Sequence, residues 1–250
     1  MSNPSLQSNA AGAADQAARP SRPKLSLGAR AFGSFAVVTL VFIAVLFLPA
    51  GTFRFWQGWA YLAVLCGPVF CAYVYLWKHD PETLERRLKS EERVSEQKRL
   101  MRWARLLSVG IFLLPGFDYR FGWSRGLLGE QPLWLTWLSL ALALAGILSA
   151  LWVLKVNRFA GSTIGVEASQ TVISTGPYRI VRHPMYAAGT ILWLFTPLAL
   201  SSWVSLPAFA LVIRFCVLRI LSEEKVLGEQ LTGYTEYCLR TRYRLIPFVW

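Results

Sequence analysis

Long apolar runs alternate with short polar segments along most of this chain. A helix that crosses a bilayer needs about 20 predominantly apolar residues, and several of the runs approach or reach that length. The pattern predicts membrane spans at Ala31 to Pro49, Trp56 to Trp77, Trp103 to Phe117, Pro132 to Leu154, Ala187 to Leu200 and Trp203 to Leu221.

The number of spans depends on how the last apolar stretch is divided. Pro197 and the Ser201-Ser202 pair interrupt it, so it forms either a helical hairpin or one bent span. The third run is also short for a span and is expected to tilt or to use interfacial anchors. We therefore expect an all-α polytopic membrane protein of five or six transmembrane helices.

Composition agrees with a membrane protein and excludes an ordinary soluble domain. Of the 250 residues, 54% are hydrophobic, and the mean hydropathy is +0.40. Residues 1–24 lack an apolar period and are expected to be a disordered cytosolic N-terminus. Residues 25–154 are expected to hold the N-terminal transmembrane helices, and residues 155–250 a C-terminal core. The first apolar run is longer than the core of a signal peptide and is expected to be an uncleaved anchor.

The net charge of +12 is distributed in a way that favours a membrane surface over nucleic acid. Basic residues precede the first span, and the loop 78–105 carries nine basic against six acidic residues. By the positive-inside rule these segments lie in the cytoplasm, as do both termini and residues 155–185. A polybasic face against anionic lipid headgroups accounts for the excess charge. Arginine far outnumbers lysine and no organelle address is evident, so we expect a bacterial inner membrane.

Candidate chemistry concentrates in residues 175–189, which we call the cradle. Its sequence is Thr-Gly-Pro-Tyr-Arg-Ile-Val-Arg-His-Pro-Met-Tyr-Ala-Ala-Gly. Each proline fixes its own φ and disfavours helix at the preceding residue, so Gly176-Pro177 and His183-Pro184 predict a rigid, non-helical segment.

Four side chains of the cradle suit a ligand that carries a carboxylate and an aromatic base. Tyr178 and Tyr186 supply ring surfaces with hydroxyl groups, Arg182 a fork of donors, and His183 a donor or acceptor. Charge at the mouth of an apolar segment is costly, which favours a functional role.

A second cluster lies at the expected cytoplasmic end of the last span. Arg219 and Glu223 are four residues apart and share a helical face. A carboxylate at that depth binds an ammonium, and an arginine one turn deeper holds an anion. Arg214, Glu224 and Lys225 are interpreted as charges that mark the membrane boundary.

The order of these motifs resembles a known family. Gly-Pro-Tyr-x-x-x-Arg-His-Pro-x-Tyr is followed, after a hydrophobic hairpin, by Glu-Glu and then by Arg-x-Arg-x-Ile-Pro. Between about Asn157 and Pro247 this pattern is similar to the isoprenylcysteine carboxyl methyltransferases, and related membrane methyltransferases for phospholipids and small thiols share it. The resemblance implies an integral membrane enzyme that binds S-adenosylmethionine in a cytosolic pocket and takes a lipophilic acceptor from the bilayer.

The resemblance also implies residue roles. Arg219 falls where the family contacts the substrate carboxylate, with Arg182 and His183 as further candidate catalytic residues. The residues expected to bind the cofactor are Gln170, Thr171, Val172, Ile173, Tyr178, His183, Pro184, Met185, Tyr186 and Glu223.

Methyl transfer from a sulfonium mainly requires that a nucleophile is held in line and that water is excluded. A carboxylate acceptor needs no general base, whereas a thiol or a phospholipid amine must lose a proton, for which His183 is the candidate. Sterol-type membrane reductases share an Arg-His-Pro-x-Tyr signature and bind NADPH, so hydride transfer is an alternative, as is a non-catalytic protein of the same fold. The four cysteines are scattered without zinc spacing, and no metal site is expected.

The charge pattern makes a prediction about topology. In a cysteine-free background, single cysteines at positions 3, 127 and 168 should differ in their reaction with an impermeant thiol reagent added to intact cells. Only the cysteine at position 127 should be labelled, because the other two positions are expected to be cytosolic. Labelling at position 168 would place the cradle on the opposite side.

Overall fold

The computed structural model describes residues 26–88, 109–157 and 170–250, and within these ranges it contains helices and no strand. The all-α prediction is therefore confirmed. The expectations for residues 1–24, for most of the basic loop and for the start of the third run fall outside the described residues. The helices are α2 (Leu27–Ala50), α3 (Trp56–His79), α4 (Pro81–Leu88), α6 (Trp123–Leu128), α7 (Leu133–Val156), α8 (Pro184–Ala199), α9 (Leu206–Gln230) and α10 (Tyr234–Arg240), with 3-10 turns η1 (Gly176–Arg179) and η2 (Trp203–Ser205).

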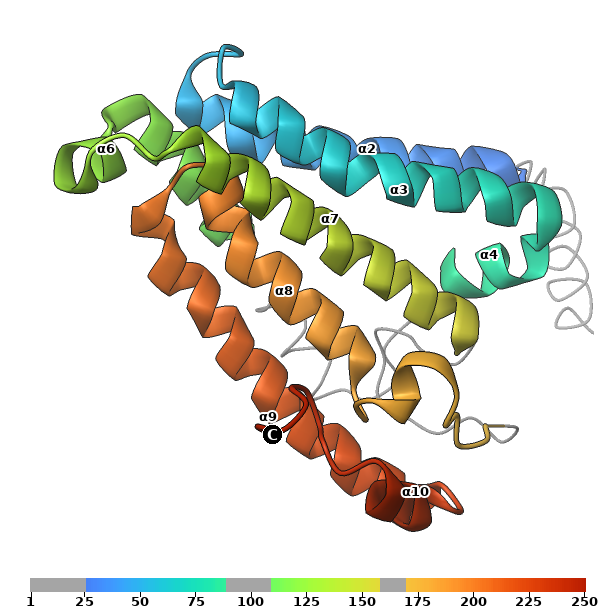
Figure 1. Cartoon of the computed structure of the whole chain (residues 1–250). Coiled ribbons are helices and arrows are strands. Elements are labelled where there is room, and N and C mark those ends of the chain that lie inside the picture. The colour runs from blue at the N-terminus through green and yellow to red at the C-terminus, as the bar shows by residue number, and fades with distance from the viewer. Residues whose placement is uncertain (1–25, 89–108, 158–169) are drawn as a thin grey trace, which may run out of the picture.

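The long helices lie side by side and fan out from one end of the molecule (Figure 1). α2 packs on α3, α3 on α7, α7 on α8 and α8 on α9. They converge near α6, and α9 diverges from α7 toward α10 (Figure 1). We refer to the two ends as the α6 end and the cradle end.

The last apolar stretch forms two separate helices rather than one bent span. α8 ends at Ala199, Ser201 adopts a positive φ of 54°, and η2 leads into α9. The Ser202 amide donates to the Pro197 carbonyl at 2.8 Å, so the turn satisfies its own backbone. Among the described residues four segments are long and apolar enough to cross a membrane: Leu27–Ala50, Trp56–His79, Leu133–Val156 and Trp203–Gln230.

Two helices extend beyond the apolar runs that predicted them. Residues 109–121 are helical, and α9 continues to Gln230, past the expected end at Leu221. The segment Asp118 to Gln131, which lies between the third and fourth predicted spans, also contains α6. Hydropathy locates the apolar part of a helix, whereas the helix itself continues into the polar interface until its backbone is capped.

Small residues allow the helices to approach closely. A Cβ atom added at Gly146 of α7 would lie 2.9 Å from the Ala188 carbonyl oxygen of α8. A Cβ at Gly116 would lie 2.5 Å from the Leu46 carbonyl oxygen of α2. Inside a bilayer, such backbone proximity replaces the hydrophobic effect as the source of helix association.

We predict that Gly146→Ala destabilises the protein, because α8 backbone must move to admit the methyl group. The expected loss is about 1–3 kcal/mol, the scale of overpacking a tight interface. The measurement is the thermal unfolding temperature in detergent. Gly67→Ala is the matched control, since Gly67 lies in α3 and, in the described part of the chain, no atom outside its own helix lies within 4 Å of the added Cβ. Equal unfolding temperatures for the two variants would contradict this account of the α7–α8 contact.

Candidate active site

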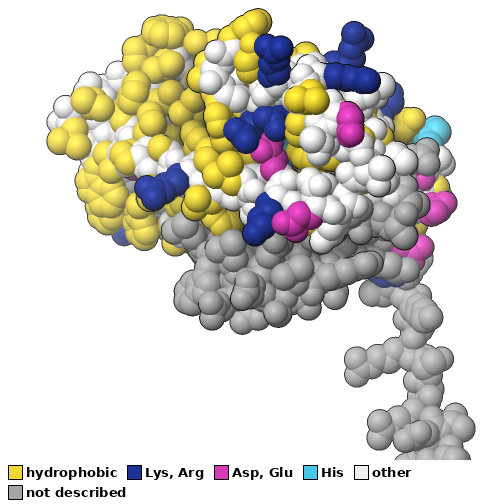
Figure 2. Space-filling view, turned by 90° about the horizontal axis from the view of Figure 1, so that it is seen from below, with side chains coloured by type: hydrophobic (Ala, Val, Ile, Leu, Met, Phe, Trp, Pro, Cys, Tyr) yellow, Lys and Arg dark blue, Asp and Glu magenta, His cyan; other side chains and the backbone are white. Residues whose placement is uncertain are grey.

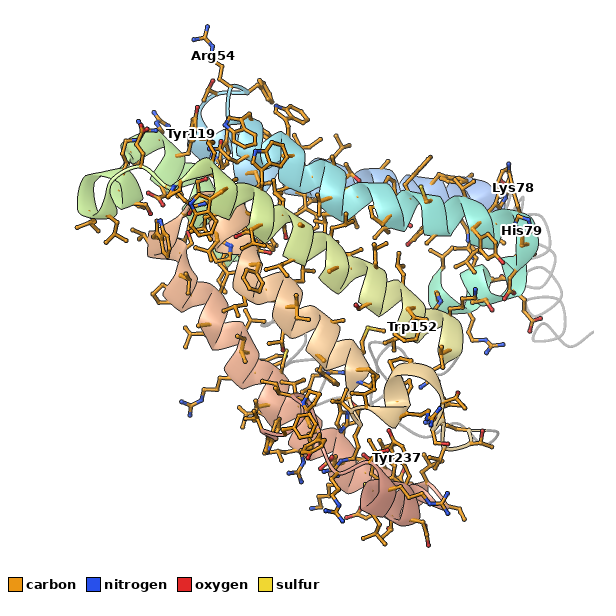
Figure 3. The ribbon with its side chains drawn as sticks, in the orientation of Figure 1. Arg54, Lys78, His79, Tyr119, Trp152 and Tyr237 are labelled. Carbon is orange, nitrogen blue, oxygen red and sulfur yellow. The ribbon has the colours of Figure 1, made fainter. Side chains whose placement is uncertain are left out.

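The predicted site residues gather at the cradle end, where the start of α8, the C-terminal half of α9, α10 and residues 241–250 meet. The side-chain view places Tyr237 of α10 there, at the opposite end of the molecule from Arg54 (Figure 3). Viewed from below, the molecule shows basic and acidic side chains together beside an apolar surface (Figure 2).

The prediction that the whole cradle is non-helical is wrong: Gly176–Arg179 form a 3-10 turn, and α8 begins at Pro184, so only residues 180–183 between them are irregular. Both prolines lie in the first turn of a helix, where a missing N–H costs nothing. His183 has φ −121° and ψ 62°, and Pro184 begins α8. Gly176 has φ +57°, a left-handed conformation that favours glycine, and its added Cβ would lie 3.2 Å from Val156. The cradle backbone is therefore fixed at both prolines.

The backbone of the cradle is held by the segment 241–250. The Arg182 amide donates to the Tyr243 carbonyl at 2.8 Å, and the His183 amide donates to the Arg244 carbonyl at 2.9 Å. Both groups lack a helical partner, so these bonds satisfy donors that would otherwise be buried and unpaired.

Glu224 joins three segments through its carboxylate. Its Oε1 lies 2.8 Å from Arg182 Nη1 and 3.3 Å from His183 Nε2, and its Oε2 accepts from Arg244 Nε at 2.7 Å. The Glu224 side chain is only 12% exposed. A carboxylate that binds two guanidinium groups is strongly held in its charged form, so Glu224 is an electrostatic clamp.

Arg182 directs its guanidinium at the protein itself. Besides Glu224, Nη1 contacts Cys238 Sγ at 3.3 Å and Nη2 donates to the Arg242 carbonyl at 3.0 Å. The side chain is 11% exposed. This arrangement suits a residue that positions the cradle.

Glu223 belongs to a different cluster from its neighbour Glu224. The Tyr186 hydroxyl donates to Glu223 Oε2 at 2.7 Å and accepts from Arg219 Nε at 3.1 Å. The predicted shared face of Arg219 and Glu223 is thus present, with a tyrosine hydroxyl between the two charges. His183 lies beside this cluster, because its ring packs edge-on against Tyr186 at 5.8 Å.

Tyr178 is fixed from two sides. Asn157 Nδ2 donates to its hydroxyl at 2.8 Å, and the Tyr237 hydroxyl donates to its carbonyl at 2.8 Å. Burial raises the pKa of the Tyr178 hydroxyl, and the nearby Glu223 carboxylate raises that pKa further. Burial also raises the pKa of Tyr237. Both phenols therefore stay neutral at physiological pH.

The remaining predicted residues lie on either side of these clusters. Pro184 is buried and Met185 half-buried in the first turn of α8. Immediately before the cradle runs an extended segment in which Thr171 is exposed and Gln170, Val172 and Ile173 are half-buried.

Sequence reasoning missed Glu224 and Arg244 as parts of this site. Glu224 was interpreted as a boundary charge, and Arg244 lay in the Arg-x-Arg motif without an assigned role. The available signal was the pairing of two acidic residues at the end of an apolar helix, followed by a second basic motif with which one of them could pair.

Comparisons with known proteins agree with this architecture. Residues 134–232 match the phospholipid methyltransferase family. The structure is similar to that of the eukaryotic intramembrane Ras methyltransferase ICMT, an isoprenylcysteine carboxyl methyltransferase. The TM-score is 0.58 and the identity 17%, over 86% of this chain and 74% of that one. A comparison with curated proteins gives no match.

The matched residues include the whole cradle, α8 and α9, which carry most of the site; α10 and residues 241–250 lie beyond the match. The resemblance predicted from the sequence is confirmed: this chain matches the phospholipid methyltransferase family over residues 134–232 and has the fold of an integral membrane methyltransferase.

Proposed function

We propose that this protein transfers a methyl group from S-adenosylmethionine to a lipophilic acceptor, with a carboxylate as the preferred acceptor group. The observation that carries the proposal is the convergence of Glu223, Tyr186, Arg219 and His183 at one end of the α8–α9 pair. This site contains an anion, a cation and aromatic surfaces beside an apolar hairpin.

The donor and acceptor set fits the cofactor. Glu223 accepts from the Tyr186 hydroxyl through one oxygen, which leaves acceptor capacity on the carboxylate for the ammonium of a methionine-like ligand. Tyr178 and Tyr186 supply ring faces, and His183 supports Tyr186. The segment Gln170 to Ile173 and residues Pro184 and Met185 complete the proposed pocket. When bound, S-adenosylmethionine would supply the activated methyl group.

Arg219 is the proposed ligand of the acceptor anion. Its guanidinium is a planar fork that suits a carboxylate, and its Nε is oriented by Tyr186. Tyr186 thereby links the proposed acceptor ligand to Glu223, the proposed cofactor ligand. Arg182 acts as a positioning residue through Glu224.

A phospholipid amine or a thiol is the second candidate acceptor, favoured by the family match over residues 134–232. Such an acceptor must lose a proton as the bond to the methyl group forms. His183 is the residue for that task, with Glu224 orienting its Nε2. We further propose that the site faces the cytosol of a bacterial cell, as the distribution of basic residues favours.

We predict that Glu223→Gln and Arg219→Ala impair different steps, cofactor binding in the first variant and turnover in the second. Glu223→Gln should weaken S-adenosylmethionine binding by about 1.5–3 kcal/mol, the scale of a charge-assisted hydrogen bond. Arg219→Ala should leave cofactor affinity nearly unchanged and lower turnover of an anionic acceptor. The measurements are calorimetric titration in detergent and incorporation of a labelled methyl group into a membrane extract.

The same titration with NADPH tests the alternative chemistry. Binding of NADPH in preference to S-adenosylmethionine would contradict the proposed function. Loss of cofactor binding in Arg219→Ala but not in Glu223→Gln would reverse the two roles while leaving the methyltransferase assignment intact.

We predict that Glu224→Gln impairs the whole site, because it removes the anion that pairs with Arg182 and Arg244. Leaving the nearly buried Arg182 guanidinium without its anion costs on the order of 3 kcal/mol, so both the unfolding temperature and the cofactor affinity should fall. Glu229→Gln is the matched control, since Glu229 is an exposed residue of the same helix. If Glu224→Gln behaved like this control, the clamp would have no positioning role.

A further inference from the structure

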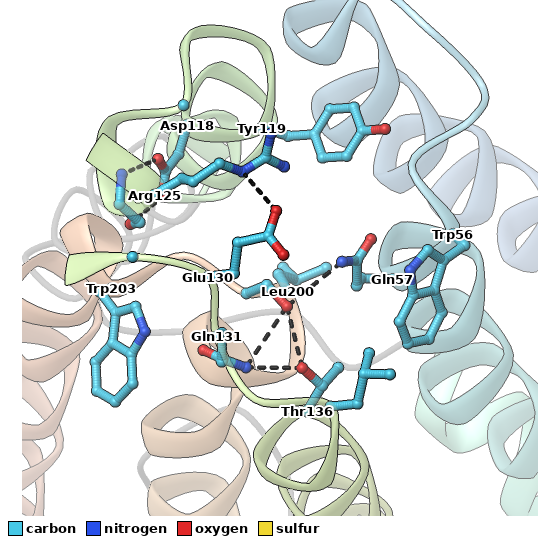
Figure 4. A pocket seen from close by; sticks show the side chains of 15 residues that line it. Trp56, Gln57, Asp118, Tyr119, Arg125, Glu130, Gln131, Thr136, Leu200 and Trp203 are labelled. Atoms are coloured by element: carbon cyan, nitrogen blue, oxygen red, sulfur yellow. Dashed lines mark hydrogen bonds and ion pairs between the residues drawn. The ribbon is translucent and has the colours of Figure 1, made fainter. Parts of the chain in front are cut away.

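A polar cavity lies at the α6 end, remote from the proposed active site. Its walls come from the start of α3, from residues 118–133 and from the turn between α8 and α9 (Figure 4). The 16 residues of α8 separate this turn from His183, at the start of the helix, by about 24 Å at 1.5 Å per residue. The cavity is therefore a separate site.

The cavity is larger than an ordered water requires. Its volume is about 240 Å³, whereas one buried water needs about 10–15 Å³ on the same measure. It can thus hold the polar part of a small amphiphile.

Hydrogen-bond acceptors are in excess around this cavity. The Oε1 atoms of Gln57 and Gln131 are buried and have no hydrogen-bond partner among the described residues. The Leu198 carbonyl distinguishes the nitrogen of the Gln131 amide from its oxygen, because Nε2 donates to it at 2.7 Å, and a carbonyl can only accept. A buried acceptor without a donor is costly, so a ligand that brings several N–H groups is favoured if the two side chains turn toward the cavity when it binds.

One charge of each sign lies beside these acceptors. Arg125 Nε and Glu130 Oε1 are 3.6 Å apart, and their side chains are 68% and 82% exposed. An exposed pair of this kind is weak, so both groups can bind a ligand instead of each other. Glu130 extends into the space between Arg125 and Gln57 (Figure 4).

The Asp118 carboxylate lines the same cavity, but its hydrogen bonds to the protein occupy it, so it is not a candidate ligand-binding group. Its carboxylate accepts from the Ser124 amide at 2.7 Å and from the hydroxyls of Ser124 and Ser202. These bonds connect the helix 109–121, α6 and the α8–α9 turn. Asp118 therefore fixes the cavity wall.

We propose that this cavity binds the headgroup of a phospholipid that carries a primary ammonium next to its phosphate. The ammonium would pair with the exposed Glu130 and, once the side chains of Gln57 and Gln131 turn toward it, donate to their oxygens; the phosphate would pair with Arg125. Trp56 and Trp203 line the same cavity, and tryptophan is typical of the membrane interface, which identifies a lipid rather than a soluble molecule as the source of the headgroup.

This proposal is independent of the methyl-transfer chemistry. It concerns the opposite end of α8, and it requires no reaction of the bound lipid. Loss of lipid binding at the α6 end would leave the proposed function intact, and failure of the cofactor titrations would leave this site intact.

The test compares headgroups that differ in N–H donors. Delipidated protein in detergent is titrated with dioctanoyl phosphatidylethanolamine, phosphatidylcholine and phosphatidylglycerol, and with phosphoethanolamine, and binding is followed by native mass spectrometry and unfolding temperature. The ethanolamine lipid should bind roughly tenfold more tightly than the choline lipid, whose quaternary ammonium has no N–H. Equal binding of these two lipids, or preference for phosphatidylglycerol, would overturn the proposal. Phosphoethanolamine binding as tightly as the lipid would overturn the assignment to a lipid.

Variants locate the binding to this cavity. Gln57→Met removes one unpaired acceptor at similar volume, and Glu130→Gln removes the exposed carboxylate. Each should reduce the preference for the ethanolamine lipid severalfold. Arg125→Gln should weaken both the ethanolamine and glycerol lipids, whereas Arg54→Gln, the same charge change on an exposed arginine outside the cavity, should weaken neither. Unchanged lipid preference in both Gln57→Met and Glu130→Gln, or equal effects of the two arginine variants, would place the lipid elsewhere.

Discussion

The proposed active site depends on the ion pairs that the Glu224 carboxylate forms. This carboxylate binds Arg182 and His183 of the cradle and Arg244 of the segment 241–250, while its own backbone belongs to α9. Three parts of the chain that are distant in sequence therefore meet at one nearly buried anion. Since each cation would be left poorly paired without it, the folding of the cradle, the docking of the last residues and the orientation of His183 are coupled.

The membrane explains why the cradle needs such support. Non-helical backbone near the bilayer is tolerated only where the protein satisfies its polar groups, and here the amides of Arg182 and His183 pair with carbonyls of residues 243 and 244. α8 contributes a second constraint, because its 16 residues extend about 24 Å, less than the roughly 30 Å of a hydrocarbon core. A helix this short would bring His183 and Tyr186 toward the apolar layer, where the proposed lipophilic acceptor would be found.

Periodicity and proline positions predict the helices, the break at His183-Pro184 and the shared face of Arg219 and Glu223, because these features depend on neighbours within one or two turns. The same signals say nothing of partners that are distant in sequence. The role of Glu224 depends on Arg244, twenty residues later, and the hydroxyl between Arg219 and Glu223 comes from Tyr186 on another helix. The cavity at the α6 end was missed for the same reason, since Gln57 and Gln131 are unremarkable residues until the fold brings them together.

Adjacent positions on a helix point about 100° apart, and this offset gives the two glutamates separate surroundings. Glu224 faces the cradle and the segment 241–250, whereas Glu223 faces Tyr186 and, through it, Arg219. The first cluster holds the backbone of the cradle and orients His183. The second contains the charge proposed to meet the acceptor. The cradle and the segment 241–250, held together by Glu224, can therefore stay the same for acceptors as different as a carboxylate and an amine. The choice between such acceptors would depend on the side chains around Arg219.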